Sequence, residues 1–96
     1  MAEFTWSVAT PDGPVASGTA DFVVVPTTRG ELGVMAGHAA LGAAVKPGEL
    51  RVTTGGAVKT IPVTAGVVEV RDDTVRLMLA AAAPAAAAQS STTQTP

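Results

Sequence analysis

The stretch that decides the fold runs from Phe22 to His38 and reads FVVVPTTRGELGVMAGH. Its β-branched run ends at Pro26, a polar turn follows, and glycines then flank a short apolar run. Residues 22–25 are apolar throughout, which is typical of a strand covered on both faces, or covered on one face and docked on the other. We therefore predict a strand over Ser17–Val25 with a bulge or bend at Gly18, a loop over Thr27–Gly30 and a strand over Leu32–Met35.

The same reading extends outward in both directions from this stretch. Phe4, Trp6 and Val8 alternate with polar or small residues, and this period of two predicts a half-buried strand. Thr10–Gly13 is a turn signal, because its proline presets φ and its glycine tolerates positive φ. Toward the C-terminus, Leu41–Val45 is compatible with a strand or with the start of a helix.

A first hairpin is predicted around Gly55-Gly56, a typical two-residue turn. Such a turn places Val52 opposite Lys59 on one face. Because an apolar and a charged side chain match poorly, we expect a bulge or an additional loop residue there. Pro62 cannot donate to a central ladder, so it indicates an edge strand or a strand end.

A second hairpin is predicted around Asp72-Asp73, and the residue patterns on both of its faces favour the same strand register. A two-residue turn pairs apolar residues on one face and opposite charges on the other: Val70 with Val75, Val68 with Leu77, and Glu69 with Arg76. In all, the chain predicts roughly seven or more short strands with turn signals about every 8–12 residues. This pattern, with no amphipathic helix, indicates an all-β sandwich or barrel.

Composition narrows the class of protein further. The chain has 96 residues, a net charge of −2 and no cysteine. It is therefore one small domain without disulfides or thiolate chemistry, and nucleic-acid binding has no electrostatic support. We read no signal peptide at the start. The longest apolar run, Leu77–Ala88, is shorter than the ~20 residues of a spanning helix, so we expect any membrane association to come through a partner.

The C-terminal part differs in composition from the rest. No charged residue follows Arg76, and two alanine runs flank Pro84 before a Gln/Ser/Thr-rich end. Alanine favours helix, but the proline divides the run, and helices that short are marginal in water. We place a single domain at residues 1–80 and expect a flexible tail at residues 81–96.

No residue pattern points to catalysis or to a cofactor. His38 is the only histidine, and no cysteine or carboxylate spacing around it suggests a metal site or an activated nucleophile. Asp72-Asp73 is ordinary turn chemistry, and Gly55-Gly56 with Lys59 lacks the phosphate-loop pattern. We therefore expect a non-enzymatic protein with no metal and no cofactor.

Glu31 is the one charge whose role stays open at this point. It lies between glycines in a loop and has no obvious internal partner. It is either a solvated loop charge or a contact residue displayed on a rigid scaffold.

Several motifs then occur in a specific order. They are T-P-D-G at residues 10–13, S-G-x-A-D-F-V-V-V-P-T-T-x-G-E-L-G-V at 17–34, G-H-A-x-L at 37–41, K-P-G-E-L-R-V at 46–52 and G-V-V-E-V at 66–70. Together they resemble the N-terminal β-sandwich domain of the epsilon subunit of F-type ATP synthase. The resemblance covers about residues 4–79, nearly the whole predicted domain.

This resemblance implies a flattened two-sheet sandwich of about ten strands. It also implies a non-catalytic central-stalk subunit that docks the gamma subunit onto the c ring and couples ion-driven rotation to ATP synthesis. Its place would be the cytoplasmic face of the bacterial plasma membrane, as a peripheral part of the complex. By motif match, Arg29, Gly30 and Glu31 are assigned to the c ring, and His38, joined by Thr10, to the gamma subunit.

The sequence departs from the family in three places. The family usually continues into a two-helix hairpin, where this chain has its alanine-rich tail, so we expect neither an inhibitory arm nor ATP binding. Ala40 replaces a usual proline, and Ala65-Gly66 replaces a usual pair of glycines. The alternative interpretation is a stand-alone β-sandwich module that binds another protein and has no affinity for gamma.

Overall fold

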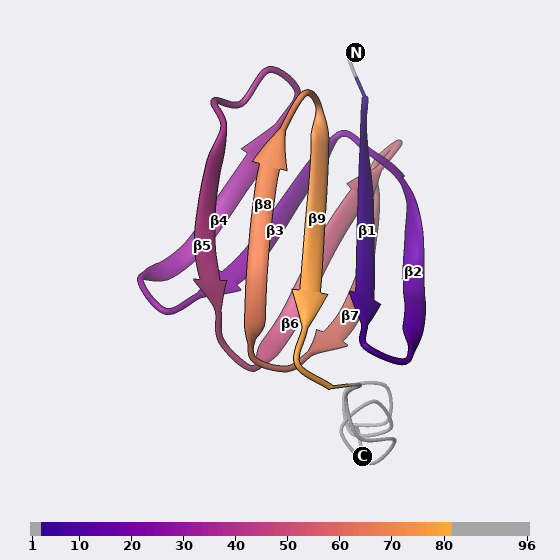
Figure 1. Cartoon of the computed structure of the whole chain (residues 1–96). Coiled ribbons are helices and arrows are strands. Elements are labelled where there is room, and N and C mark those ends of the chain that lie inside the picture. Colours follow the sequence, from indigo (N-terminus) through magenta and orange to yellow (C-terminus); the bar gives the residue numbers. More distant parts are fainter. Residues whose placement is uncertain (1–2, 82–96) are drawn as a thin grey trace.

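The computed structural model describes residues 3–81, and this part of the chain consists of nine strands and no helix (Figure 1). In chain order the strands are β1 (Phe4–Thr10), β2 (Gly13–Ala20), β3 (Phe22–Thr27), β4 (Gly30–Met35), β5 (Leu41–Val45), β6 (Gly48–Thr54), β7 (Ala57–Val63), β8 (Gly66–Arg71) and β9 (Thr74–Leu79). The all-β prediction is confirmed, with nine strands where about ten were expected. Apart from Ala81, the predicted tail lies outside the described residues.

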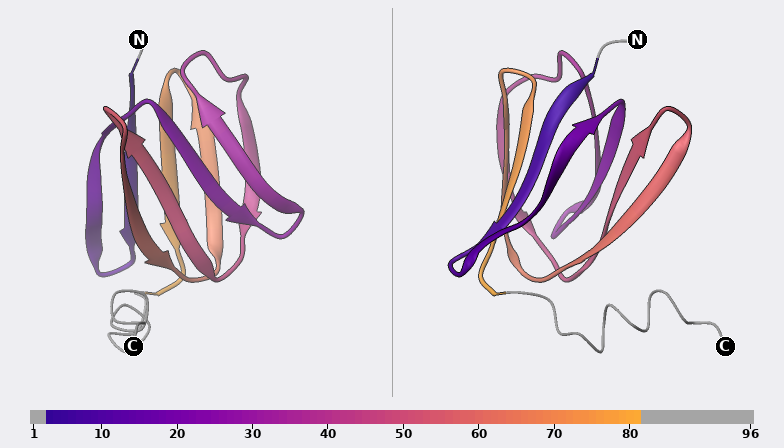
Figure 2. Two further views of the ribbon diagram at one scale, coloured as in Figure 1. Left: turned by 180° about the vertical axis from the view of Figure 1, so that it is seen from behind. Right: turned by 90° about the vertical axis from the view of Figure 1, so that its right-hand side faces the viewer.

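The strands form one curled sheet that folds into two layers. Its order is β2-β1-β9-β8-β5-β3-β6-β7, with β4 added to β3. Neighbours are antiparallel except for β1 and β9, which run parallel. Because β5 and β3 share only the pair Thr27–Val45, the sheet turns there from one layer to the other (Figures 1 and 2). The predicted two-sheet sandwich is therefore confirmed.

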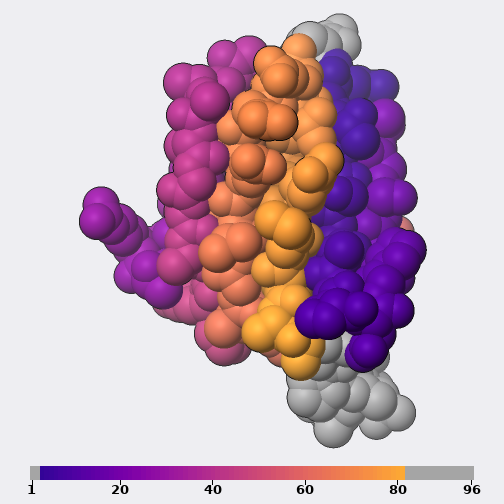
Figure 3. All heavy atoms as spheres, viewed as in Figure 1, coloured from indigo at the N-terminus to yellow at the C-terminus, as the bar shows by residue number. Residues whose placement is uncertain are grey.

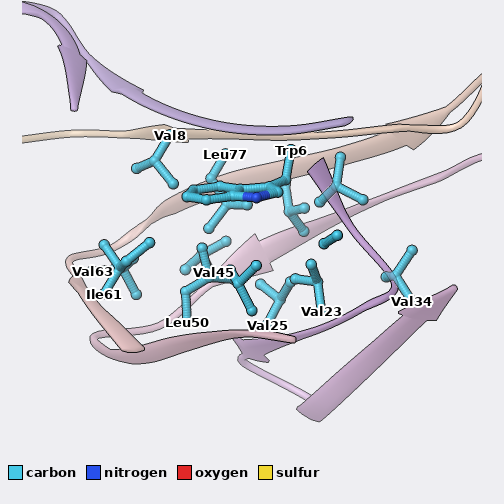
Figure 4. Close-up of a cluster of buried hydrophobic side chains, with 14 of the residues drawn as sticks. Trp6, Val8, Val23, Val25, Val34, Val45, Leu50, Ile61, Val63 and Leu77 are labelled. Atoms are coloured by element: carbon cyan, nitrogen blue, oxygen red, sulfur yellow. The ribbon is translucent and has the colours of Figure 1, made fainter. Parts of the chain in front are cut away.

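The core lies between these two layers and is built from alternate residues of each strand. Phe4, Trp6 and Val8 of β1 are at most 3% exposed, as the period of two predicts. Figure 4 shows the Trp6 ring among valines and leucines from both layers. Fully burying one such side chain contributes about 1.5–3 kcal/mol, so this cluster is the main source of the domain's stability.

The β8–β9 hairpin has the predicted register. Its cross-strand pairs are Val70 with Val75, Val68 with Leu77 and Glu69 with Arg76. Asp72 and Asp73 both adopt positive φ, 52° and 56°, which is the geometry of a two-residue type I′ turn. Glu69 and Arg76 lie opposite each other across the strands but do not form an ion pair. The ion pair found within residues 3–81 joins Glu31 to Arg51.

The β6–β7 hairpin corrects one prediction. Val52 lies opposite Lys59 with no bulge, and Gly55 and Gly56 make the tight turn in the left-handed region. The expected bulge is wrong because Lys59 stays exposed although Val52 opposite it is buried, so the charged side chain does not have to leave this face. Pro62 lies in β7, a strand at one end of the sheet, so the edge prediction is confirmed.

A second correction concerns Ser17–Val25, which is two strands rather than one. The chain breaks at Asp21, whose N–H donates to the carbonyl of Thr53 at 2.8 Å and whose carboxylate accepts from the N–H of Gly55 at 2.9 Å. Asp21 thereby carries the chain from the first layer to the second. Gly18 forms no bulge, since the only register shift between β1 and β2 falls at Val8/Ala9.

The inner face of the strand β3 is fully covered, and its outer face is covered only in part. Val23 and Val25 are fully buried, whereas Phe22 is 37% exposed on the outer face. The Phe22 ring lies over Gly33 of β4, where an added Cβ would meet it at 3.1 Å. Within residues 3–81 the outer face of the run Phe22–Val25 is therefore partly open, with Val24 half-buried, so full coverage on both faces is not found. The ambiguous run Leu41–Val45 is a strand, β5.

Candidate functional site

The β3–β4 turn holds the residues predicted to face a c ring, and it projects from one side of the molecule (Figure 3). Thr27 pairs with Gly30, so Thr28 and Arg29 form a two-residue turn and the predicted loop is shorter than expected. Gly30 adopts a φ of +113°, which a residue with a side chain rarely does. Arg29, Gly30 and Glu31 are all exposed.

Thr27 fixes the shape of this turn from inside. It is the one buried polar residue of the described chain, 5% exposed. Its hydroxyl donates to the carbonyl of Gly30 at 2.5 Å and accepts from the N–H of Arg29 at 3.2 Å. On the outer side, the N–H of Thr28 donates to the carbonyl of Ala44 in β5 at 3.0 Å. The turn is therefore held on two sides and presents Arg29 in a defined place.

Glu31 has an internal partner, which corrects the sequence interpretation. Its Oε1 accepts from Nη2 of Arg51 on β6 at 3.0 Å, with side chains 61% and 42% exposed. An exposed pair of this kind contributes about 0–1 kcal/mol. Within residues 3–81 this is the only ion pair, so Arg29 forms none there and is the uncompensated charge of the turn.

A groove of about 440 Å³ lies between the β3–β4 turn and β5. Its lining is made of small or polar residues with one cation: Thr27, Thr28, Arg29, Gly42, Ala43 and Ala44. The groove exists because β3 and β5 share a single residue pair and then diverge. Its shape and its one charge suit a polar segment of another chain better than a buried apolar ligand.

The β4–β5 loop, residues 36–40, holds His38. The His38 N–H donates to the carbonyl of Met35 at 3.1 Å, and the Gly37 N–H donates to Oδ1 of Asp73 at 2.8 Å. The His38 ring contacts the carbonyl of Ala39 through Nδ1 at 2.7 Å. Since a carbonyl only accepts, this contact requires a proton on Nδ1, and Nε2 of this half-buried side chain makes no hydrogen bond within residues 3–81.

Thr10 lies at the other end of the sandwich from His38. Its hydroxyl accepts from the N–H of Asp12 at 3.1 Å and contacts the carbonyl of Gly13 at 3.4 Å, so it serves its own turn. The N–H of Thr5 donates to the carbonyl of Asp73, which places the His38 loop near the start of β1. Thr10 lies five positions further along the strand than Thr5, roughly 16 Å away. The structure does not bring Thr10 and His38 together.

Within residues 3–81 we also looked for a metal site, a membrane-spanning helix and a further polar pocket. No group of three or more histidine, cysteine or carboxylate residues there could hold a metal ion. Among residues 3–81, no helix is long and apolar enough to span a bilayer. A polar pocket lined by Glu69, Arg71, Asp72, Thr74 and Arg76 is small, at about 170 Å³, and carries both positive and negative charges.

The sequence did not reveal the roles of three residues that support these surfaces, Thr27, Asp73 and Arg51. Thr27 gave a partial signal, since threonine before a glycine turn commonly bonds the local backbone. Asp73 was recognised as a turn residue, but its bond to a loop 36 residues earlier left no trace in local sequence. Arg51 reaches Glu31 only because β6 pairs with β3.

The fold and these surfaces define a class: a two-layer β-sandwich whose candidate sites are side chains on tight turns. The chain belongs to the family described as ATP synthase, Delta/Epsilon chain, beta-sandwich domain, whose sequence model matches residues 3–85.

Curated relatives agree with this family. The chain is 40% identical over 82 residues to the ATP synthase epsilon chain of Alkalihalophilus pseudofirmus, covering 85% of this chain and 62% of that one. It is 43% identical over 82 residues to the epsilon chain of Shouchella clausii, with the same coverage of 85% and 62%. With epsilon chain 1 of Nitrobacter hamburgensis it shares 43% over 72 residues, covering 75% and 53%. The chain thus spans little more than half the length of these relatives.

Solved structures give the same fold. A chain of the Euglena gracilis mitochondrial ATP synthase, from a structure of OSCP/F1/c-ring, superposes with a TM-score of 0.77 at 25% identity. The match covers 88% of this chain and 54% of that one. A chain from the central stalk/c-ring of the Tetrahymena thermophila mitochondrial ATP synthase superposes with a TM-score of 0.66 at 20% identity, covering 80% and 63%. The second match bears on the fold alone.

Proposed function

We propose that the chain is a non-catalytic central-stalk subunit of a rotary F-type ATP synthase. In this role it docks the gamma subunit onto the c ring and couples ion-driven rotation to ATP synthesis. The observation that carries the proposal is the family match across residues 3–85. The rigid, projecting β3–β4 turn supports it, because coupling requires a contact that does not yield under torque.

The β3–β4 turn is our proposed c-ring contact, through Arg29, Gly30 and Glu31. Arg29 supplies an uncompensated positive charge, whereas the charge of Glu31 is compensated by Arg51. The turn therefore meets a polar or acidic surface more favourably than a basic one. Gly30 has no side chain, so a partner surface could approach its backbone closely. Its φ of +113° is also one that residues with a side chain rarely adopt.

The β4–β5 loop is our proposed gamma contact, through His38. Its Nε2 lies on the other side of the ring from the internal contact that Nδ1 makes, and so is available to a polar group on gamma. Thr10 joins the gamma surface only if gamma runs along β1, because Thr10 ends that strand and the His38 loop lies near its start. The two ends of β4 would then face two different partners.

The proposed location is the cytoplasmic face of the bacterial plasma membrane, where the chain is held peripherally by its partners. It inserts into no bilayer and binds no ATP or other cofactor in this proposal. The alternative, a stand-alone β-sandwich module for another protein partner, predicts a stable monomer with no affinity for gamma.

The test is capture of the purified chain by the cognate gamma subunit and by the isolated c ring in detergent. We expect binding to gamma at micromolar concentration. His38→Ala should weaken capture by gamma and leave c-ring association unchanged, and Arg29→Ala should do the reverse, so each variant is the control for the other. No binding to gamma would refute the proposed function, and equal effects of both variants would refute the division into two surfaces.

A further inference from the structure

A cleft separates the two ends of the curled sheet. Figure 2, in its right-hand panel, shows β2 and the β6–β7 hairpin as these two ends. The cleft has a volume of about 300 Å³ and is lined by Trp6, Ser17, Gly18, Thr19, Val52, Thr54, Ala57, Val58 and Lys59. β2 and β7 each have one neighbouring strand, so each presents backbone groups without a sheet partner along its outer edge.

The indole of Trp6 is a buried donor at this cleft. Trp6 is 3% exposed, and none of the hydrogen bonds found within residues 3–81 involves its Nε1. A buried indole N–H usually has an acceptor, and leaving it without one is unfavourable. Gly18 lies directly over the ring, and a Cβ there would be 3.2 Å from Nε1. Glycine at this position therefore keeps the approach to the donor open.

The rest of the lining indicates what would occupy the cleft. One end is closed by the bond from the Thr54 hydroxyl to the carbonyl of Thr19, at 2.9 Å. Val52 and the 62% exposed Val58 give apolar walls, and Lys59 is the only charged lining residue. A single water, with a share of liquid volume of about 30 Å³, is far too small to fill this space.

We propose that this cleft binds an extended, acidic peptide segment of a partner protein. A backbone carbonyl of the segment accepts from Nε1 of Trp6, its carboxylate faces Lys59, and its main chain pairs with the free edge of β2 or β7. Strand addition of this kind obtains affinity from main-chain bonds and specificity from the flanking side chains. The inference does not depend on the proposed gamma and c-ring contacts, because none of their residues lines this cleft.

The test uses the fact that the chain has one tryptophan. The probe is the capped peptide acetyl-Thr-Val-Glu-Val-Thr-amide, titrated against the full chain labelled with ¹⁵N, with the indole N–H resonance as readout. We expect a saturable shift of that resonance at millimolar peptide. A peptide with lysine in place of glutamate should bind about twofold to fivefold more weakly, as for an exposed ion pair.

Two variants and a matched control decide the site. Gly18→Ala, which crowds Nε1, should abolish the indole shift, and Lys59→Gln should remove the preference for the acidic peptide. Gly42→Ala is the control, because its Cβ would meet only the Val68 carbonyl at an ordinary 3.7 Å. The proposal is overturned if the resonance does not respond, if Gly18→Ala responds like the unmodified chain, or if the indole exchanges magnetisation with water alone and peptide does not displace it.

Discussion

The two ends of β4 are held in place in different ways. At its start, the β3–β4 turn is organised by Thr27, three residues from its bonding partner Gly30. At its end, the β4–β5 loop is held by Asp73, 36 residues away in sequence and in the other layer of the sandwich. The side-chain support of the first surface therefore lies within one hairpin, with a backbone bond from Thr28 to Ala44 of β5 beside it, whereas the side-chain support of the second comes from the other layer. Stability and order should respond differently at the two ends.

The largest effect is expected when the local support of the β3–β4 turn is removed. Thr27→Val keeps the shape of a buried side chain but leaves the N–H of Arg29 and the carbonyl of Gly30 without their partner. We expect the free energy of unfolding to fall by about 1–3 kcal/mol, because two part-buried hydrogen bonds of about 0.5–1.5 kcal/mol each are lost. Urea denaturation followed by circular dichroism measures this loss.

Thr28→Val is the matched control for that variant. The Thr28 side chain is exposed and in no hydrogen bond within the described chain, and only its backbone N–H contacts β5. Its substitution should change stability by no more than about 0.5 kcal/mol. Equal losses in the two variants would mean that the Thr27 hydroxyl does not hold the turn.

The two hairpins show how far the sequence could predict this fold. In β8–β9, both faces and the turn favour one register, and the structure has it. In β6–β7, the turn residues favoured one register while the face pattern opposed it, and the turn prevailed. Face patterns determine register only where a core covers the face. Because Lys59 stays exposed, its side chain placed no constraint on the pairing.

The candidate surfaces were less predictable than the strands for a related reason. The position of Arg29 in a turn followed from local glycine and proline signals, but Gly30 and Glu31 begin β4 rather than lying in a loop. The partner of Glu31 did not follow from such signals, because Arg51 is 20 residues away in sequence and comes beside it only through the pairing of β3 with β6. The same holds for Asp21, whose bonds to Thr53 and Gly55 divide a run that reads as one strand.

A smaller effect is expected when the distant support of the β4–β5 loop is removed. Asp73→Ala deletes the acceptor for the N–H of Gly37 and also places alanine at a φ of 56°. Asp72→Ala is the matched control, since it has a similar φ of 52° and its side chain makes no bond to the loop. We expect Asp73→Ala to be less stable than Asp72→Ala by about 1 kcal/mol, the usual contribution of one hydrogen bond.

Hydrogen exchange distinguishes the two ends in this variant. In Asp73→Ala the Gly37 amide should lose protection while the Arg29 amide keeps it, because Thr27 still holds the other turn. Asp73→Asn should restore protection at Gly37, since an amide oxygen replaces the carboxylate as acceptor. Loss of protection at Arg29 as well would contradict the independence of the two ends.

The smallest effect concerns the ion pair that joins β4 to β6. A double-mutant cycle with Glu31→Gln and Arg51→Gln should give a coupling free energy of about 0.2–1 kcal/mol, because both side chains are largely exposed. The coupling should vanish near about 1 M salt, where the Debye length is about 3 Å. A coupling well above this range would mean that the β3–β4 turn depends on β6 as much as on Thr27. It would then resemble the β4–β5 loop in needing a distant strand, and Glu31 would act as a structural residue rather than as part of a contact surface.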